Sequence, residues 1–98
     1  MLKRSQYPKT LLIGDEVYTI KFVRKLPDAE DTFTSGECDP SSKEIRIRQG
    51  LGPEETLKTF IHELCHAIFE FESNVTIPHK LINRMEEPLY KFLVANLL

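Results

Sequence analysis

The chain has 98 residues, enough for one modest hydrophobic core but too few for two. Its composition, with 41% hydrophobic and 29% charged residues, is that of a globular domain. A formal net charge of -2 provides no general attraction to nucleic acid or to anionic lipid, so neither is expected as a partner. We therefore predict a single domain that covers residues 1–98.

The N-terminal region and the cysteines indicate the compartment. The longest early apolar run, Leu11 to Ile13, is too short for a signal peptide or a membrane span. Cys38 and Cys65 form neither a CxxC pair nor a disulfide framework, which agrees with a reducing environment. These features predict a cytoplasmic protein in which both cysteines are small structural residues.

The first half of the chain is predicted to form strands. Residues 10–23 contain two β-branched and aromatic runs on either side of Gly14-Asp15, the pattern of a β-hairpin. After a polar segment, residues 32–49 contain a second pair of extended runs that flank turn residues 39–42. The sequence therefore predicts a small, twisted sheet of about four strands, antiparallel or mixed.

The last of these strands is unusually charged. In the sequence KEIRIRQ, Ile45 and Ile47 alternate with Arg46 and Arg48, which predicts one buried face and one solvated face. A strand with so many charges is typical of a sheet edge. We therefore expect this strand at the edge, with both arginines exposed to solvent.

The second half is predicted to be helical, beginning with residues 53–72. Proline and two glutamates open this segment, where the helix dipole favours negative charge. At 100° per residue, the apolar side chains form a single wide stripe: Leu57, Phe60, Ile61, Leu64, Ala67, Ile68 and Phe71. His62 and His66 lie nearly opposite this stripe, so they are not expected in the core.

The same helix contains the motif HExxH, formed by His62, Glu63 and His66. Residues four apart share one helix face, so both imidazoles can converge on one tetrahedral zinc ion. Glu63 lies to the side of the metal, where it can take a proton from a water whose pKa the zinc has lowered. Ordinary solvated histidines are the alternative interpretation, but three specified residues at this spacing rarely coincide by chance.

A catalytic zinc needs a third protein ligand and an open position. The expected source is a second helix that begins near Pro78, whose predicted buried stripe comprises Leu81, Ile82, Met85, Leu89, Phe92 and Leu93. His79 and Glu86 both lie at the edge of this stripe. If the two helices are antiparallel, Glu86 is level with the zinc, while His79 requires helices that cross. Pro88 is expected to kink or break the second helix.

The segment TLKTFIHELCHAIFEF, residues 56–71, resembles the zincin metallopeptidase signature. Its position after CDPSSKEIRIRQ is similar to that in compact zincin-like peptidases of phages and bacterial mobile elements, a likeness that extends over residues 32–97. The resemblance implies an active-site helix against a small sheet whose edge strand binds extended peptide. HELCHA also resembles the SprT-like proteases of DNA–protein crosslink repair, but their cysteine-rich zinc ribbon has no counterpart here.

The resemblance also bears on the third ligand. The sequence HKLINRMEEPLYKFLVAN matches the register of the corresponding family helix when His79 takes the ligand position. An offset of twenty residues between His66 and Glu86 instead resembles thermolysin-type enzymes. His79 is the preferred third ligand, and Glu86 is the alternative ligand or a partner that orients a ligand imidazole.

The sequence as a whole predicts an α+β domain with a helix bearing HExxH and a C-terminal helix. We expect a Zn2+-dependent peptidase with Glu63 as general base and a peptide or protein as substrate. The alternative is a non-catalytic zinc-binding module for regulation or interaction. Phe69 is expected to wall the cleft. Tyr90 is expected to pack at the helix surface rather than to stabilise an oxyanion.

Overall fold

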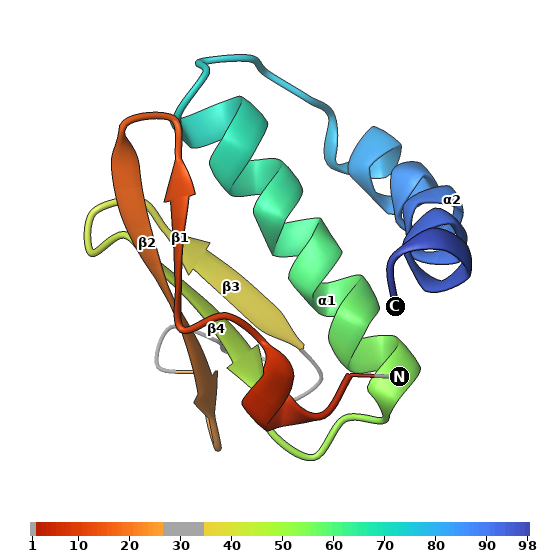
Figure 1. The fold of residues 1–98 in the computed structure, drawn as a ribbon. Coiled ribbons are helices and arrows are strands. Elements are labelled where there is room, and N and C mark those ends of the chain that lie inside the picture. Colours follow the sequence, from red (N-terminus) through yellow and green to blue (C-terminus); the bar gives the residue numbers. More distant parts are fainter. Residues whose placement is uncertain (1, 27–34) are drawn as a thin grey trace.

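The computed structural model describes residues 2–26 and 35–98. It is an α+β fold in which a four-stranded mixed sheet is followed by two helical segments, as predicted (Figure 1). In chain order the elements are η1 (Arg4–Gln6), β1 (Thr10–Ile13), β2 (Glu16–Val23), β3 (Gly36–Asp39), β4 (Glu44–Arg48), α1 (Pro53–Cys65), the π-helical turn η2 (His66–Phe71) and α2 (His79–Asn96).

The strand order in the sheet is β1-β2-β4-β3. The predicted hairpin is confirmed: β1 and β2 are antiparallel, and Gly14 between them adopts φ 62°, a conformation that glycine reaches without steric cost. β3 and β4 are also antiparallel, whereas β2 and β4 are parallel. The prediction that the charged strand lies at the edge is wrong, because β4 is internal and, within the described residues, β1 and β3 are the edge strands.

Arg46 corrects the sequence interpretation further. It is 9% exposed rather than solvated, and its guanidinium contacts the carboxylates of Glu37, Asp39 and Glu44. The strand register explains this contact, since Glu37 lies directly opposite Arg46 on β3. Arg48 is half-buried. A charge inside the sheet is tolerated here because the neighbouring side chains neutralise it and accept its hydrogen bonds.

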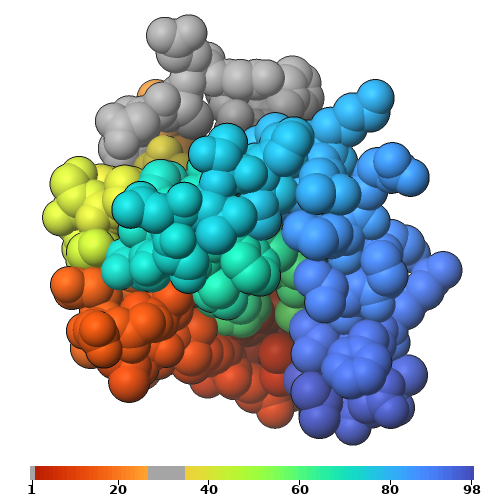
Figure 2. Space-filling view, turned by 90° about the horizontal axis from the view of Figure 1, so that it is seen from above, coloured from red at the N-terminus to blue at the C-terminus, as the bar shows by residue number. Residues whose placement is uncertain are grey.

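The helix α1 lies between the sheet and α2, so it is covered on two sides (Figures 1 and 2). Towards the sheet, its residues pack against a core formed by Ile13, Tyr18, Ile20, Ile45, Ile47 and Ala67. Towards α2, a second cluster comprises Tyr7, Leu57, Ile61, Cys65 and Ile82. The prediction that Cys65 is a core residue is confirmed. This central position also buries Thr59 and Glu63, which periodicity alone assigns to a polar face.

The predicted helix over residues 53–72 does not remain α-helical to its end. After Cys65 the chain forms the π-helical turn η2, in which the amide of Glu72 donates to the carbonyl of Ala67. The extra residue in the turn changes which side chains face the sheet. Ile68 and Phe71, both expected in the buried stripe, are therefore 39% and 38% exposed.

The second helix also differs from its prediction in two respects. It runs from His79 to Asn96 without a break at Pro88. Of its predicted buried stripe only Ile82 is buried, while Leu81, Leu89 and Phe92 are exposed, because α2 packs on α1 with one side only. Across the described ranges, 2–26 and 35–98, no helix has the length and apolar character needed to cross a membrane.

Candidate metal centre

Three histidines converge beside α1. His62 and His66 project from consecutive turns of α1 and η2, and His79 projects from the start of α2. One nitrogen from each ring can be chosen such that all three lie within 4.8 Å of one another. The ring centroids of His79 lie 4.7 Å from that of His62 and 5.2 Å from that of His66. These three side chains could hold a metal ion.

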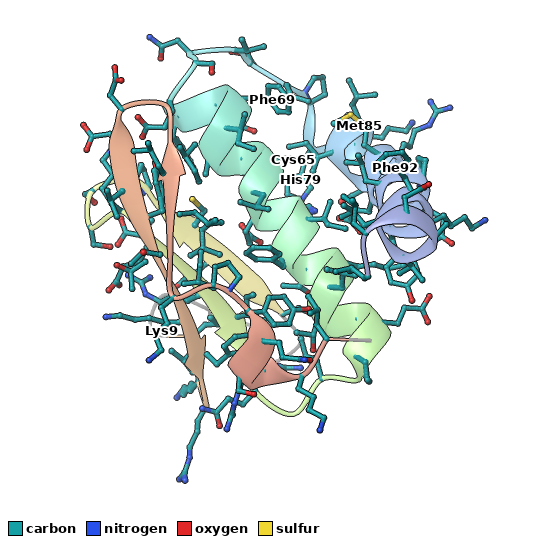
Figure 3. The ribbon with its side chains drawn as sticks, in the orientation of Figure 1. Lys9, Cys65, Phe69, His79, Met85 and Phe92 are labelled. Carbon is teal, nitrogen blue, oxygen red and sulfur yellow. The ribbon has the colours of Figure 1, made fainter. Side chains whose placement is uncertain are left out.

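The crossing of the two helices brings His79 into this cluster. Figures 1 and 2 together show that α2 crosses α1 steeply instead of running back alongside it. Figure 3 places His79 at the beginning of α2, on the side that faces α1. The geometry that the sequence required for His79 is therefore present.

Glu86 has a different position from the one that antiparallel helices would give it. Glu86 lies on α2 one turn after Asn83, and its carboxylate contacts Nδ1 of His62. His66 has an equivalent partner, because Glu70 Oε1 lies 2.9 Å from its Nδ1. A carboxylate at each Nδ1 selects the tautomer that leaves Nε2 with a free lone pair. The two Nε2 atoms face each other at 3.2 Å.

Glu63 lies on α1 beside the edge strand β3 and lines the same pocket as the three histidines. Its side chain is 7% exposed and has no hydrogen-bond or ion-pair partner within the residues that the structure describes. Burial, reinforced by the carboxylates of Glu37 and Glu86, raises the pKa of Glu63 to about 7. A buried carboxyl group without a fixed partner is available to gain or lose a proton near neutral pH.

Gly36 explains how Glu63 and the edge strand approach each other so closely. A Cβ atom built on Gly36 would lie 2.6 Å from Thr59 Cγ2, 2.9 Å from the Arg46 carbonyl oxygen and 3.4 Å from Glu63 Cγ. Only glycine therefore fits where β3 meets α1. This close contact forms one wall of the site.

These residues line an open pocket of about 840 Å³ between β3, α1 and α2. Most of its lining residues are of polar or charged types: Ser35, Gly36, Glu37, Cys38, Glu54, Glu55, Lys58, Thr59, His62, Glu63, His66, Glu70, Phe71, His79, Asn83 and Glu86. Lys58 is neutralised by Glu54 and Glu87. Phe71 is the only large apolar side chain among the lining residues.

The positions of Phe69, Tyr90 and Cys38 can be compared with the roles predicted for them. Phe69 was expected to wall the cleft, but Phe71 lines the pocket instead, and Figure 3 shows Phe69 near the far end of η2. Tyr90 packs in the second core cluster beneath Lys58 and does not line the pocket, in agreement with a packing role. Cys38 packs partly against the first core cluster, and burial raises the pKa of its thiol to about 12.

Sequence reasoning missed Glu70 and Asn83. Glu70 lies four residues after His66, a spacing that places side chains on one helix face and could have identified it as a partner. Asn83 lies one turn after His79 on the face of α2 that borders the pocket. It could have been inferred only with knowledge that the helices cross.

Comparison of the chain with protein-family models, with curated proteins and with solved structures found no match.

Proposed function

We propose that this protein is a zinc-dependent peptidase of the zincin type, in which His62, His66 and His79 hold the metal and Glu63 is the general base. The observation that carries this proposal is the convergence of three imidazoles beside a buried carboxyl group that has no partner in the described chain. Burial of an acid that has no partner in the described residues costs free energy, so Glu63 is not needed to stabilise the fold.

The donor set favours zinc over other metals. Three imidazole nitrogens are typical of catalytic zinc, which keeps its fourth position open. Two nitrogens at about 2.0–2.1 Å from a tetrahedral zinc lie about 3.3 Å apart, close to the 3.2 Å between the two Nε2 atoms. Glu86 contacts Nδ1 of His62, and Glu70 contacts Nδ1 of His66. Carboxylates in such positions commonly orient the imidazole ligands of a metal.

Glu63 is suited to proton transfer. A bound zinc would polarise the scissile carbonyl and lower the pKa of the attacking water. A carboxyl group with a pKa near 7 can accept the proton of that water and then donate it to the leaving amine. Burial between α1 and β3 keeps Glu63 away from competing cations, so its side chain remains free for this exchange.

The edge strand supports a peptide as the substrate. Within the described residues, β3 pairs with β4 on one side only, and its first three residues line the pocket. An extended peptide could add to such an edge through main-chain hydrogen bonds. This arrangement would place a substrate carbonyl beside the histidines, as in the zincin-like peptidases that the sequence resembles.

One observation favours a second candidate function, a zinc-supported binding module. α2 packs on α1 and buries only Ile82 fully, so its apolar contact with the rest of the protein is small. A metal bound through His79 would attach α2 to α1 and contribute directly to folding. Such a module has no need of a general base.

The substitution Glu63→Gln separates the two functions. Glutamine keeps the size of the side chain but cannot accept the proton, so peptide cleavage should fall by about 10²- to 10⁴-fold. The zinc content should remain at about one per chain, and thermal stability should not decrease. Cleavage is measured on a peptide library, zinc by elemental analysis, and Glu54→Gln provides a control that removes an exposed carboxylate from the same pocket.

Three outcomes are informative. Loss of cleavage with zinc retained supports the peptidase. Equal cleavage by the wild type and the Glu63→Gln variant would exclude this mechanism. A protein that binds zinc tightly and unfolds more easily without it, but cleaves no peptide in the library, would instead support the zinc-supported module.

A further inference from the structure

We propose that the π-helical turn η2 is the positioning device of the metal site, holding the imidazole of His66 between Glu70 and Phe71. The inference rests on the proposed metal centre, and its test includes a measurement that needs no metal. It assigns to Glu70 and Phe71 the role of positioning residues, which act through His66.

The first contact fixes the ring on its Nδ1 side. Nδ1 of His66 donates to Glu70 Oε1 at 2.9 Å, and both residues belong to η2. The hydrogen bond selects the tautomer in which Nε2 carries the lone pair. It also restrains rotation of the ring about χ2, so that Nε2 points towards His62.

The second contact fixes the plane of the ring. The rings of His66 and Phe71 are stacked, with centroids 6.4 Å apart and an angle of 28° between their planes. In a regular α-helix, residues five apart point about 140° away from each other. The π-helical turn, with its hydrogen bonds between residues five apart, brings Phe71 to the side of His66. This is why Phe71 lines the pocket and not the core.

The far end of the turn is anchored to the sheet. Glu72, directly after η2, accepts hydrogen bonds from the Tyr18 hydroxyl at 2.6 Å and from Lys43 Nζ at 2.8 Å. These partners come from β2 and from the turn before β4. The chain between His66 and Glu72 has a fixed number of residues. The wider π-helical turn accommodates these residues and keeps Glu70 and Phe71 beside His66.

The two motif histidines are therefore held by different means. The carboxylate at Nδ1 of His62 comes from α2 through Glu86, whereas the carboxylate at Nδ1 of His66 comes from η2 itself through Glu70. His66 also contacts His62 and His79, but its Nδ1 partner and its stacked ring both belong to its own turn. The turn η2 thus orients one ligand of the site, His66.

The decisive experiment compares Glu70→Ala with the wild type in two measurements. In metal-free protein above the pH at which imidazoles titrate, nitrogen NMR should show His66 protonated at Nδ1 in the wild type. In the variant this preference should be lost, since its hydrogen-bond acceptor is missing. Zinc affinity, measured by competition with a chelator, should fall by about 10- to 100-fold.

Two further variants separate positioning from folding. Glu70→Gln keeps an acceptor oxygen, so it should retain the Nδ1-H tautomer and lose less affinity than Glu70→Ala. Phe71→Leu should alter the absorption spectrum of bound cobalt, while Phe69→Leu, in the same turn but outside the pocket, should not. If Glu70→Ala does not fold, the cobalt pair decides the question: spectra of Phe71→Leu and Phe69→Leu that both equal the wild-type spectrum would overturn the positioning role.

The results distinguish this inference from the proposed function. An unchanged His66 tautomer and a zinc affinity within threefold of the wild type in Glu70→Ala would overturn the positioning role and leave the peptidase proposal intact. A wild type that binds no zinc would overturn the proposed function. The NMR comparison would then still decide whether Glu70 orients His66.

Discussion

Two groups of acidic side chains, one around Arg46 and one around the three histidines, are stabilised in different ways, although Glu37 of the first group also borders the pocket. On the outer face of the sheet, Glu37, Asp39 and Glu44 surround the guanidinium of Arg46. On the inner side, Glu63, Glu70 and Glu86 lie around the three histidines. The first group has a positive charge from the protein itself, while the second surrounds three imidazoles and includes the buried carboxyl group of Glu63.

The pKa shifts follow this difference. On the outer face, hydrogen bonds from Ser41 and Arg46 hold the pKa of Asp39 well below its usual range. On the inner side, burial raises the pKa of Glu63. A charge-balanced cluster stabilises the fold, whereas an unbalanced one lowers stability and is typical of a functional site. The number of acids therefore does not identify a functional site; the inner group differs because, within the described residues, Glu63 has no cationic partner.

The largest expected effect concerns the third ligand on the inner side. If His79 coordinates zinc, His79→Ala should lower zinc affinity by more than about 100-fold, because a direct metal bond is lost. Glu86→Ala should lower it by only about 10- to 100-fold, because Glu86 acts through His62. Chelator competition measures both values. The reverse order would show that Glu86 is the ligand and His79 a neighbour.

The second prediction concerns the outer cluster. Arg46→Met leaves three carboxylates facing one another without their cation, so the free energy of unfolding should fall by about 2–3 kcal/mol. This lies near the lower limit for a broken buried ion pair, because the carboxylates retain some contact with water. Urea denaturation measures the change. Arg48→Met is the matched control, since Arg48 forms no ion pair in the described ranges.

The zinc affinity of the Arg46→Met variant tests whether the acidic group around Arg46 influences the metal site. A protein that is less stable but binds zinc normally would confirm that the outer cluster has a structural role only. Loss of zinc binding at a temperature where the variant is folded would show that β3 transmits the disturbance to the pocket through Gly36.

The smallest expected effect is a difference in pH dependence. Zinc ligands must be deprotonated, so acidification should release the zinc. The pKa of Asp39 is lowered by Ser41 and Arg46, and that of Glu44 by Lys21 and Arg46. A carboxyl group whose pKa is lower in the folded protein than in the unfolded chain stabilises the fold at pH values above its pKa in the unfolded chain. This stabilisation is lost as the pH falls through the pKa that the group has in the folded protein.

The sheet should therefore remain folded at a pH where zinc has already been released. A chromogenic chelator follows the zinc, and far-ultraviolet circular dichroism follows the fold. Coincident transitions would contradict the comparison and would indicate that the metal holds the whole domain together.

The sequence by itself determined the elements and the central motif. Alternation of apolar residues predicted both hairpins, and helical periodicity placed His62, Glu63 and His66 on one segment, because these patterns depend only on local backbone geometry. It also named both candidates for the third ligand, His79 and Glu86. The α+β architecture followed from the order of these elements along the chain.

Only the tertiary structure decided which of these residues meet. The position of β4 inside the sheet depends on a parallel pairing with β2, which local patterns do not encode, and this pairing buries Arg46. The crossing of α2 over α1 decides that His79 joins the two histidines, while Glu86 contacts His62 from behind. The π-helical turn decides that Phe71 faces the pocket. Each outcome follows from packing between distant segments, where burial and charge compensation outweigh local preference.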